Sequence, residues 1–133
     1  MNYYTRRFVK PVDLNAANRL FGGQLLSWID EEAAIFAACQ MKREHIVTKY
    51  MSEINFLKSS QTGDVIEFGL ELVDAGRTSL TVKCHVRNKN TYELIITVER
   101  IVFVAIDADG KPTEHGYDRI EGQLEQAVVR VGD

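Results

Sequence analysis

The sequence predicts an α+β domain, in which one long helix is followed by a group of strands. Apolar residues cover almost the whole circumference of a helical segment over residues 23–41, which is typical of a helix buried inside a protein. Later segments either alternate between apolar and polar residues or are continuously apolar, as strands are. Because helix and strands are segregated along the chain, these patterns indicate an α+β arrangement.

The first predicted element is a strand over residues 3–9, which ends before Pro11, since proline has no N–H to donate to a sheet. Residues 13–20 predict a loop, because they are rich in Asn and Asp, whose side chains bond to their own backbone. The helix over residues 23–41 would be about 28 Å long, which is enough to cross a small sheet.

Four strands are expected after the helix, and turn sequences rich in Gly or Asn separate them. Two of these strands alternate cleanly, and the last is apolar on both faces, which is typical of a central strand. The pattern predicts a meander of consecutive strands over residues 47–56, 65–73, 80–87 and 94–106. A weakly amphipathic stretch over residues 117–131 predicts a short C-terminal helix.

Composition and charge favour one soluble globular domain. Of the 133 residues, 45% are apolar and 26% are charged, which is ordinary for such a domain. A net charge of −3 argues against a nucleic-acid-binding protein, which needs an excess of Lys and Arg. No apolar run reaches the roughly 18 residues of a membrane span. Cys39 and Cys84 have no metal-binding or redox spacing, so they predict reduced thiols in a cytoplasmic protein.

The stretch from Pro11 to Asp30 carries the strongest chemical signal. Gly22 and Gly23 directly precede the helix interior and allow a ligand to approach the backbone closely, since they lack a Cβ. The unpaired N–H groups and the positive dipole end of the helix favour developing negative charge. Asp30 follows about two turns later on nearly the same face. An oxyanion donor and a carboxylate base could therefore face one point, as acyl-group hydrolysis requires.

The same stretch resembles the acyl-CoA thioesterases of the hotdog fold, most closely the bacterial and brain acyl-CoA hydrolase branch. In that family a loop of the form P-x-D-x-N-x-x-G-x-x-F/H-G-G leads into a helix with Asp or Glu. The residues in these positions are Pro11, Asp13, Asn15, Phe21, Gly22, Gly23 and Asp30. The resemblance also includes VTKYMSEINFLKSSQTGDVIEF and GRTS. It covers a core over residues 6–112 of a single domain spanning 1–133, with a tail over 113–133.

The resemblance implies one antiparallel sheet wrapped around the long helix and an enzyme that hydrolyses fatty acyl-CoA to free fatty acid and coenzyme A. Asp30 would be the general base on a water molecule, or alternatively a nucleophile. Asn15 would hold the water or the thioester carbonyl. The N–H groups of Gly23 and Gly22 would bind the carbonyl oxygen. Such a reaction needs no metal and no cofactor, because coenzyme A is part of the substrate.

Further implications concern substrate binding and assembly. The turn that holds Arg77, Thr78 and Ser79 lies near bound pantetheine and phosphates in the family, so these residues and Lys58 are expected substrate contacts. Two subunits would join their sheets edge to edge, with Asn15 from one chain and Asp30 from the other at each site. This homodimer could assemble further into a tetramer or hexamer.

Each of these residues also has a structural explanation. Asp30 could stabilise the helix dipole, and Asn15 could shape its loop. The glycine pair could mark a turn, and the GRTS segment could be an ordinary hairpin turn. Glu31 and Glu32 point elsewhere around the helix and predict a solvated or interface edge, although Glu31 is a second candidate base.

Two positions depart from the family pattern. Asn18 replaces the usual Gly, and the loop should keep its shape because Asn tolerates positive φ. Ser59 follows Lys58 where the family usually has Pro, which could loosen that strand end.

Two other functions stay open. A hotdog dehydratase or hydratase generally uses a His beside the helix acid, and no His lies within residues 1–44. A non-catalytic acyl-CoA-binding module would bind the thioester without turnover. His45, His85 and His115 share no ligand spacing with Cys, Asp or Glu, so no metal site is expected.

Overall fold

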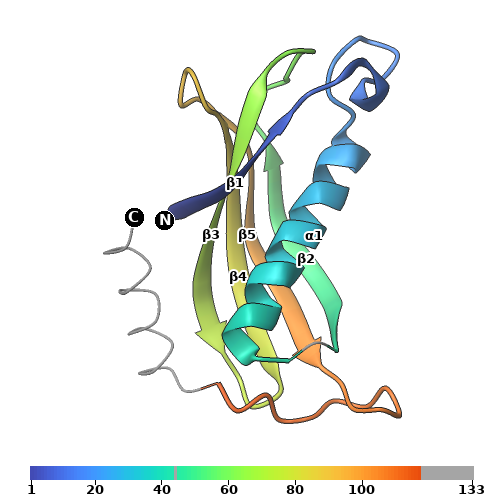
Figure 1. Cartoon of the computed structure of the whole chain (residues 1–133), viewed down its shortest axis with the longest axis vertical. Coiled ribbons are helices and arrows are strands. Elements are labelled where there is room, and N and C mark those ends of the chain that lie inside the picture. Colours follow the sequence, from blue (N-terminus) through green and yellow to red (C-terminus); the bar gives the residue numbers. More distant parts are fainter. Residues whose placement is uncertain (44, 118–133) are drawn as a thin grey trace.

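The computed structural model describes residues 1–43 and 45–117 (Figure 1). In chain order, this part forms β1 (Asn2–Phe8), the short 3-10 helix η1 (Pro11–Asp13), α1 (Gly22–Met41), β2 (Ile46–Phe56), β3 (Val65–Ala75), β4 (Ser79–Asn88) and β5 (Leu94–Ala105). The helix and the five strands that the sequence predicts here are all present. The predicted C-terminal helix lies outside the described residues from residue 118 onward.

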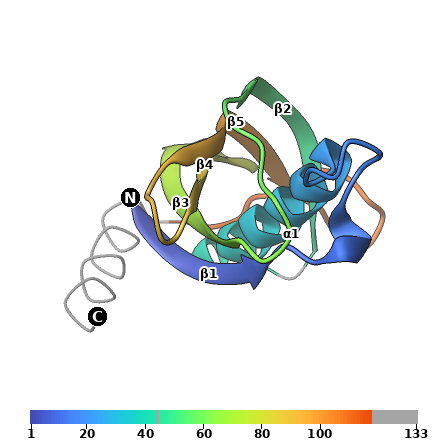
Figure 2. The same ribbon diagram turned by 90° about the horizontal axis from the view of Figure 1, so that it is seen from above.

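The five strands form one antiparallel sheet in the order β1-β3-β4-β5-β2. Seen from above, this sheet curves around α1, which lies along its concave face (Figure 2). The predicted fold, an antiparallel sheet wrapped around one long helix, is therefore confirmed.

The predicted meander is wrong at one strand. β3, β4 and β5 are consecutive neighbours, but β2 pairs with β5 at the edge of the sheet and not with β3. The connection over residues 57–64 makes this crossing, and it begins where Leu57 and Lys58 both donate their N–H groups to the Ile95 carbonyl. Alternation along a strand reports which face a residue occupies, not which strand lies beside it. The sequence pattern therefore could not reveal the crossing.

The core lies between α1 and the concave face of the sheet. The alternation predicted for β4 is confirmed, because its inward residues are all fully buried, namely Leu80, Val82, Cys84 and Val86. The helix supplies the opposite wall with Leu25, Trp28, Ile29, Ala33, Phe36 and Ala37. One stripe of α1 stays uncovered, and within it the apolar side chain of Ile35 is 55% exposed. The sheet of one chain therefore does not cover all the apolar surface of the helix.

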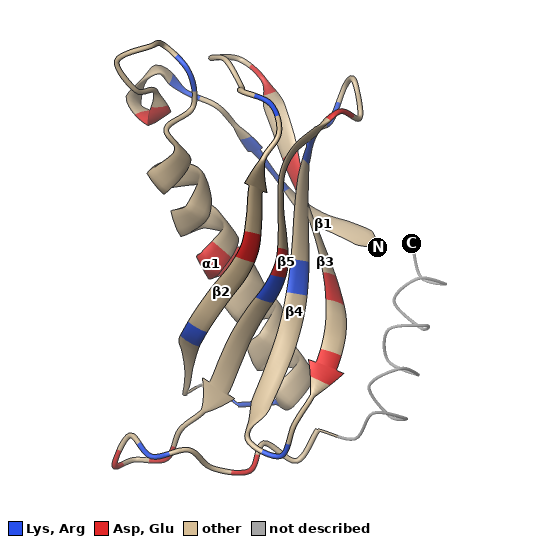
Figure 3. Cartoon of the chain, turned by 180° about the vertical axis from the view of Figure 1, so that it is seen from behind, with Lys and Arg blue, Asp and Glu red and all other residues tan. Residues whose placement is uncertain are grey.

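A buried carboxylate ties β1 to the sheet. Glu67 on β3 is only 3% exposed, and it accepts hydrogen bonds from Nε of Arg87 at 2.7 Å and from Nε of Arg6 at 3.1 Å. The Arg87 guanidinium also lies 3.7 Å from the centre of the Tyr3 ring and 4.8 Å from that of Tyr92. Figure 3, which views the sheet from the side away from α1, shows acidic and basic positions on neighbouring strands of this face. Burial alone would raise the pKa of Glu67, but the bonds from Arg87 and Arg6 outweigh it and lower this pKa below the usual 4.5.

Replacing Glu67 with glutamine should destabilise the protein by about 2–3 kcal/mol at pH 7, because two arginines lose their buried partner. The lowered pKa of Glu67 means that its contribution is complete above pH 4.5 and is lost as the pH falls through the folded-state pKa. Thermal unfolding of both proteins from pH 7 to pH 3 checks this, with the half-exposed Glu71→Gln as a milder control. A gap between wild type and E67Q that stays constant to pH 3 would contradict the ionic role of Glu67.

Candidate active site

The loop before α1 is closed by its own polar groups. The buried Asp13 carboxylate accepts a hydrogen bond from the Lys10 N–H at 2.9 Å, and the Asp13 carbonyl accepts one from the Phe21 N–H at 2.9 Å. Asn18 has a φ of 58°, so the expectation that asparagine adopts the left-handed conformation here is confirmed. The loop thus holds Asn15 in a defined position beside the start of the helix.

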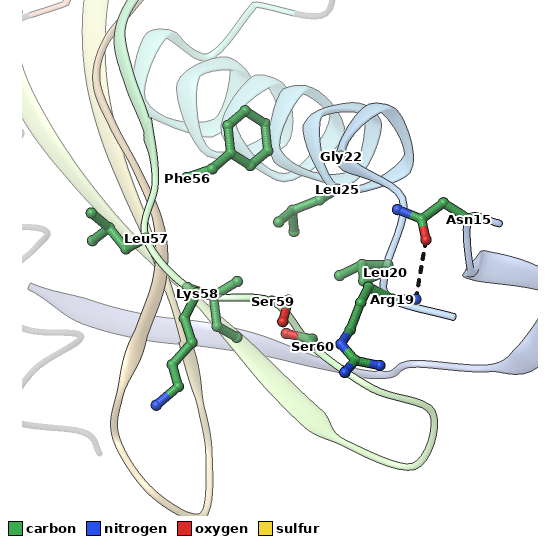
Figure 4. A pocket seen from close by; sticks show the side chains of 11 residues that line it. Asn15, Arg19, Leu20, Gly22, Leu25, Phe56, Leu57, Lys58, Ser59 and Ser60 are labelled. Atoms are coloured by element: carbon green, nitrogen blue, oxygen red, sulfur yellow. Dashed lines mark hydrogen bonds between the residues drawn. The ribbon is translucent and has the colours of Figure 1, made fainter. Parts of the chain in front are cut away.

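Asn15 shapes this loop through one of its two polar atoms. Its Oδ1 accepts hydrogen bonds from the N–H groups of Ala17 at 2.9 Å and Arg19 at 3.1 Å. Its Nδ2 has no partner within the described residues, and Figure 4 shows this nitrogen on the side of the first turn of α1. The loop-shaping explanation of Asn15 is therefore correct for the oxygen, while the amide N–H groups stay available to a ligand.

The glycine pair lies inside the first turn of α1. The helix begins at Gly22, one residue earlier than predicted, and its N-cap Phe21 makes no side-chain capping bond. The first N–H groups of the helix are thus left to other partners. A Cβ at Gly22 would lie 3.2 Å from the Phe56 ring, and one at Gly23 would lie 2.8 Å from the Phe21 ring. A side chain at either position would therefore require the neighbouring aromatic ring to move.

A cavity of about 400 Å³ opens between this first turn and the connection that follows β2 (Figure 4). Its lining is mixed, with apolar side chains from α1, β2 and β5 and polar groups from the two loops. The lining residues are Asn15, Arg19, Leu20, Gly22, Leu25, Phe56, Leu57, Lys58, Ser59, Ser60 and Ile95. Three sequence-predicted site residues, Asn15, Gly22 and Lys58, therefore meet here. The Lys58 ammonium pairs with the Glu93 carboxylate.

Asp30 lies further along α1 and is not among the residues that line this cavity. Its half-buried carboxylate accepts a hydrogen bond from the Thr48 hydroxyl on β2 at 2.7 Å. Within one chain, the structure therefore does not bring Asp30 and the glycine pair to one point. Thr48 was not predicted as a site residue, although it lies within the VTKYMSEINF segment that carries the family resemblance.

The GRTS turn lies at the opposite end of the sheet from the cavity (Figure 1). The Arg77 guanidinium pairs with the Glu114 carboxylate at 3.1 Å. The backbone carbonyls of Thr78 and Ser79 accept hydrogen bonds from the Ala105 N–H at 2.9 Å and from the His115 ring at 2.8 Å. Within one chain, the turn serves the sheet and the segment after β5.

The prediction for Glu32 is wrong. This residue was expected at a solvated or interface edge, but it is only 9% exposed and pairs with Arg7 on β1 at 2.8 Å. The helix turns its side chain inward toward β1, where the cation compensates the buried charge. Glu31 is exposed, as expected, and lies 3.3 Å from the same guanidinium.

Within residues 1–43 and 45–117, no group of three or more His, Cys, Asp or Glu side chains is arranged to hold a metal ion. None of the helices in the described part combines the length and apolar character that a membrane span requires.

Two proteins of similar sequence are named as acyl-CoA thioester hydrolases. An acyl-CoA thioester hydrolase of Salmonella typhimurium, YciA, is 32% identical over 113 residues, which cover 80% of this chain and 84% of the relative. A Bacillus subtilis protein named uncharacterized acyl-CoA thioester hydrolase YkhA is 36% identical over 128 residues, covering 91% of this chain and 70% of the relative.

Solved structures agree with these relatives. A hexameric thioesterase from Yersinia pestis superimposes with a TM-score of 0.79 at 28% identity, covering 85% of this chain and 93% of the other. The acyl-CoA hydrolase of Staphylococcus aureus, solved with butyryl coenzyme A and coenzyme A, gives 0.76 at 29% identity, covering 95% and 85%. Alanine mutants of an aspartate, an asparagine and a threonine of that hydrolase have also been solved.

The family model of the thioesterase superfamily matches residues 17–95, which include the end of the loop before α1, α1 itself, β2, β3 and β4. The fold agrees with this match, since the solved thioesterases superimpose over most of the chain. The chain therefore belongs to the thioesterase superfamily.

Proposed function

We propose that this protein is an acyl-CoA thioesterase, which hydrolyses a fatty acyl-CoA to a free fatty acid and coenzyme A. One observation carries the proposal. Asn15 and Asp30 lie as far apart in sequence as the asparagine and the aspartate whose alanine mutants were solved for the Staphylococcus aureus hydrolase. The mutated threonine of that enzyme follows its aspartate at a distance within one residue of the Asp30–Thr48 spacing.

The proposed reaction uses these groups in two steps, attack of water and cleavage of the C–S bond. Asp30 removes a proton from a water molecule, and the water oxygen attacks the thioester carbonyl carbon. The carbonyl oxygen, as it becomes negative, accepts hydrogen bonds from N–H groups at Gly22 and Gly23 and from the free amide of Asn15. The C–S bond then breaks, and protonated Asp30 returns its proton to the coenzyme A sulfur, which regenerates the base. Oxyanion donors of this kind are worth about 3 kcal/mol each, and a positioned base about 10²–10⁴-fold in rate.

Thr48 is a positioning residue in this scheme. Its hydroxyl donates to one carboxylate oxygen of Asp30 at 2.7 Å and leaves the other oxygen to the water. A carboxylate held in one orientation loses less freedom when the substrate binds, so it acts more effectively as a base.

The site would be composite, formed by two subunits. Asp30 does not line the cavity that contains Asn15 and Gly22, which supports a model in which a partner subunit brings its own Asp30 to this cavity. The exposed stripe of α1, with Ile35, and the open edge at β2, with Tyr50 45% exposed, offer an apolar surface for a second copy. The family relatives that form hexamers support such an assembly.

A two-fold axis would also affect the substrate contacts. Antiparallel pairing of two β2 edges would bring the GRTS turn of one subunit to the same end as the cavity of the other. Arg77, Thr78 and Ser79 of one subunit could then serve a coenzyme A whose thioester lies near Lys58 of the other. All four residues remain proposed contacts on this basis.

The compartment and the lack of a cofactor are also proposals. Cytoplasmic location is supported by the two free cysteines, Cys39 and Cys84. The burial of Cys84 raises the pKa of its thiol to about 12, so this thiol stays protonated and unreactive. Hydrolysis by a carboxylate and hydrogen-bond donors needs no group beyond the substrate and water.

Replacing Arg77 with alanine should raise KM for acyl-CoA several-fold and leave kcat within about twofold, because a contact to a remote phosphate binds ground and transition states alike. Steady-state kinetics on acyl-CoA and on the matching acyl-pantetheine check this, since only the first carries the phosphates. Glu114→Gln is the matched control, because it breaks the same ion pair without removing the cation. Equal losses on both substrates would mean that Arg77 has only a structural role.

The function itself is tested by free-thiol release from a panel of acyl-CoAs with purified protein. Turnover of at least one of them supports the thioesterase. Stoichiometric binding without turnover would instead identify an acyl-CoA-binding module. Loss or gain of a double bond in the acyl chain would identify a dehydratase or hydratase.

A further inference from the structure

The cavity beside the start of α1 contains a polar group that the proposed reaction does not use. Ser60 is 1% exposed, and its hydroxyl has no hydrogen-bond partner within the described residues. Ser60 lines the cavity of about 400 Å³ and also a neighbouring cavity of about 260 Å³. Figure 4 shows its side chain across the first cavity from the Phe56 ring. A buried hydroxyl without a partner is rare in folded proteins and calls for an explanation.

The backbone around Ser60 holds this hydroxyl in place. The Ser60 carbonyl accepts a hydrogen bond from the Leu20 N–H at 2.8 Å. The turn that follows is closed by the Gln61 N–H, which donates to the Asp64 carboxylate at 2.9 Å, and by the Gly63 N–H, which donates to the Val9 carbonyl at 2.8 Å. The backbone is therefore bonded on both sides of Ser60, a residue that lines both cavities.

Two backbone carbonyls of this lining are already engaged, whereas polar side chains, such as those of Asn15 and Ser59, lie on the same lining. The Ile95 carbonyl is already shared by the N–H groups of Leu57 and Lys58 at 2.8 and 3.1 Å, and the Ser60 carbonyl is taken by Leu20. Leu20, Leu25 and Ile95 add apolar surface to the same lining. A polar atom that arrives on a ligand would give this buried hydroxyl the partner that it lacks.

We propose that the Ser60 hydroxyl binds an oxygen atom on the acyl chain, so that the enzyme prefers hydroxyacyl- or oxoacyl-CoA to the unsubstituted acyl-CoA of equal length. This inference rests on the proposed function, because it assigns the cavity to the acyl group of the substrate. A hydroxyl both donates and accepts, so it matches an alcohol as well as a ketone. The part of the site that one chain forms has a volume of about 400 Å³, enough to hold a polar group of the acyl chain beside Ser60.

The first test compares substrates of one length: butyryl-CoA, both enantiomers of 3-hydroxybutyryl-CoA, and acetoacetyl-CoA. For wild type, kcat/KM should be about fivefold higher for at least one oxygenated substrate than for butyryl-CoA, as one neutral hydrogen bond provides. Ser60→Ala should reduce this ratio to about one. Ser59→Ala should keep the wild-type ratio, because the Ser59 side chain lines the same cavity but is exposed. The same ratio in wild type and S60A would overturn the proposal.

The second test needs no catalysis. If the hydroxyl has no partner in the free protein, its removal in Ser60→Ala should raise the midpoint of thermal unfolding by about 2–4 °C. An unchanged or lower midpoint would show that the hydroxyl already has a partner, such as a bound water, and would overturn the proposal. Absence of thiol release from every acyl-CoA would instead reject the proposed function, so the two failures are distinguishable.

Discussion

Replacing Asp30 with asparagine should lower kcat for acyl-CoA hydrolysis by at least about a hundredfold, the smallest effect expected for the loss of a general base. The amide has the same shape and can still accept the hydrogen bond from Thr48, but it cannot take a proton from water at neutral pH. The fold should survive, which the unfolding midpoint of the variant can confirm. Steady-state thiol release then gives kcat directly.

Two neighbouring variants make this result specific. Glu31→Gln changes the adjacent exposed carboxylate and should keep at least half of the wild-type kcat. Thr48→Val removes the hydroxyl that orients Asp30 and should cost about tenfold, since the base is present but less well held. Retention of more than about a tenth of wild-type kcat in D30N would contradict the role of Asp30, and Glu31 would become the candidate base.

Replacing Asn15 with aspartate should also lower kcat by about a hundredfold or more, as the loss of an oxyanion donor does. The carboxylate keeps an acceptor for the N–H groups of Ala17 and Arg19, so the loop should keep its shape. It cannot replace the amide donor, and its charge opposes the developing oxyanion. The substitution thus separates the loop-shaping oxygen from the proposed catalytic nitrogen.

Asn15→Ala is the comparison for this experiment, because it removes both groups at once. If Asn15 acts only by shaping the loop, N15D should be nearly as active as wild type while N15A is impaired. If the amide donor matters, both variants should lose activity to a similar extent, and N15D should keep the wild-type unfolding midpoint.

The fold was predictable from sequence because its strongest signals are local. The helix followed from apolar residues on nearly every side, and β4 followed from strict alternation, which ends with Val82, Cys84 and Val86 fully buried. The pairing of β2 with β5 was not predictable from the pattern, because it is set by a connection that crosses the end of the sheet. The loop shape at Asn18 was predictable because positive φ is a property of one residue.

The residues of the candidate site also include some that were predictable from sequence and some that were not. The glycine pair and Asp30 were predicted from their order and spacing in the chain, and Asn15 was predicted from the family resemblance. Thr48 and Ser60 were not, because their significance depends on contacts between distant segments: a hydroxyl 2.7 Å from a helix carboxylate, and a hydroxyl buried beside a cavity. Threonine on a strand and serine in a connection are ordinary by themselves. Glu32 was misassigned for the same reason, since only the fold brings Arg7 to it.

The most direct test of the composite site is complementation between two inactive variants. N15D and D30N protein are mixed, subunit exchange is verified with differently tagged chains, and thiol release is measured before and after exchange. In a mixed dimer, one site combines an intact Asn15 with an intact Asp30 of the partner subunit. Random exchange should therefore restore about a quarter of the wild-type activity, because half of the dimers are mixed and each has one complete site. No recovery despite proven exchange would place both residues in the same chain's site and contradict the composite site.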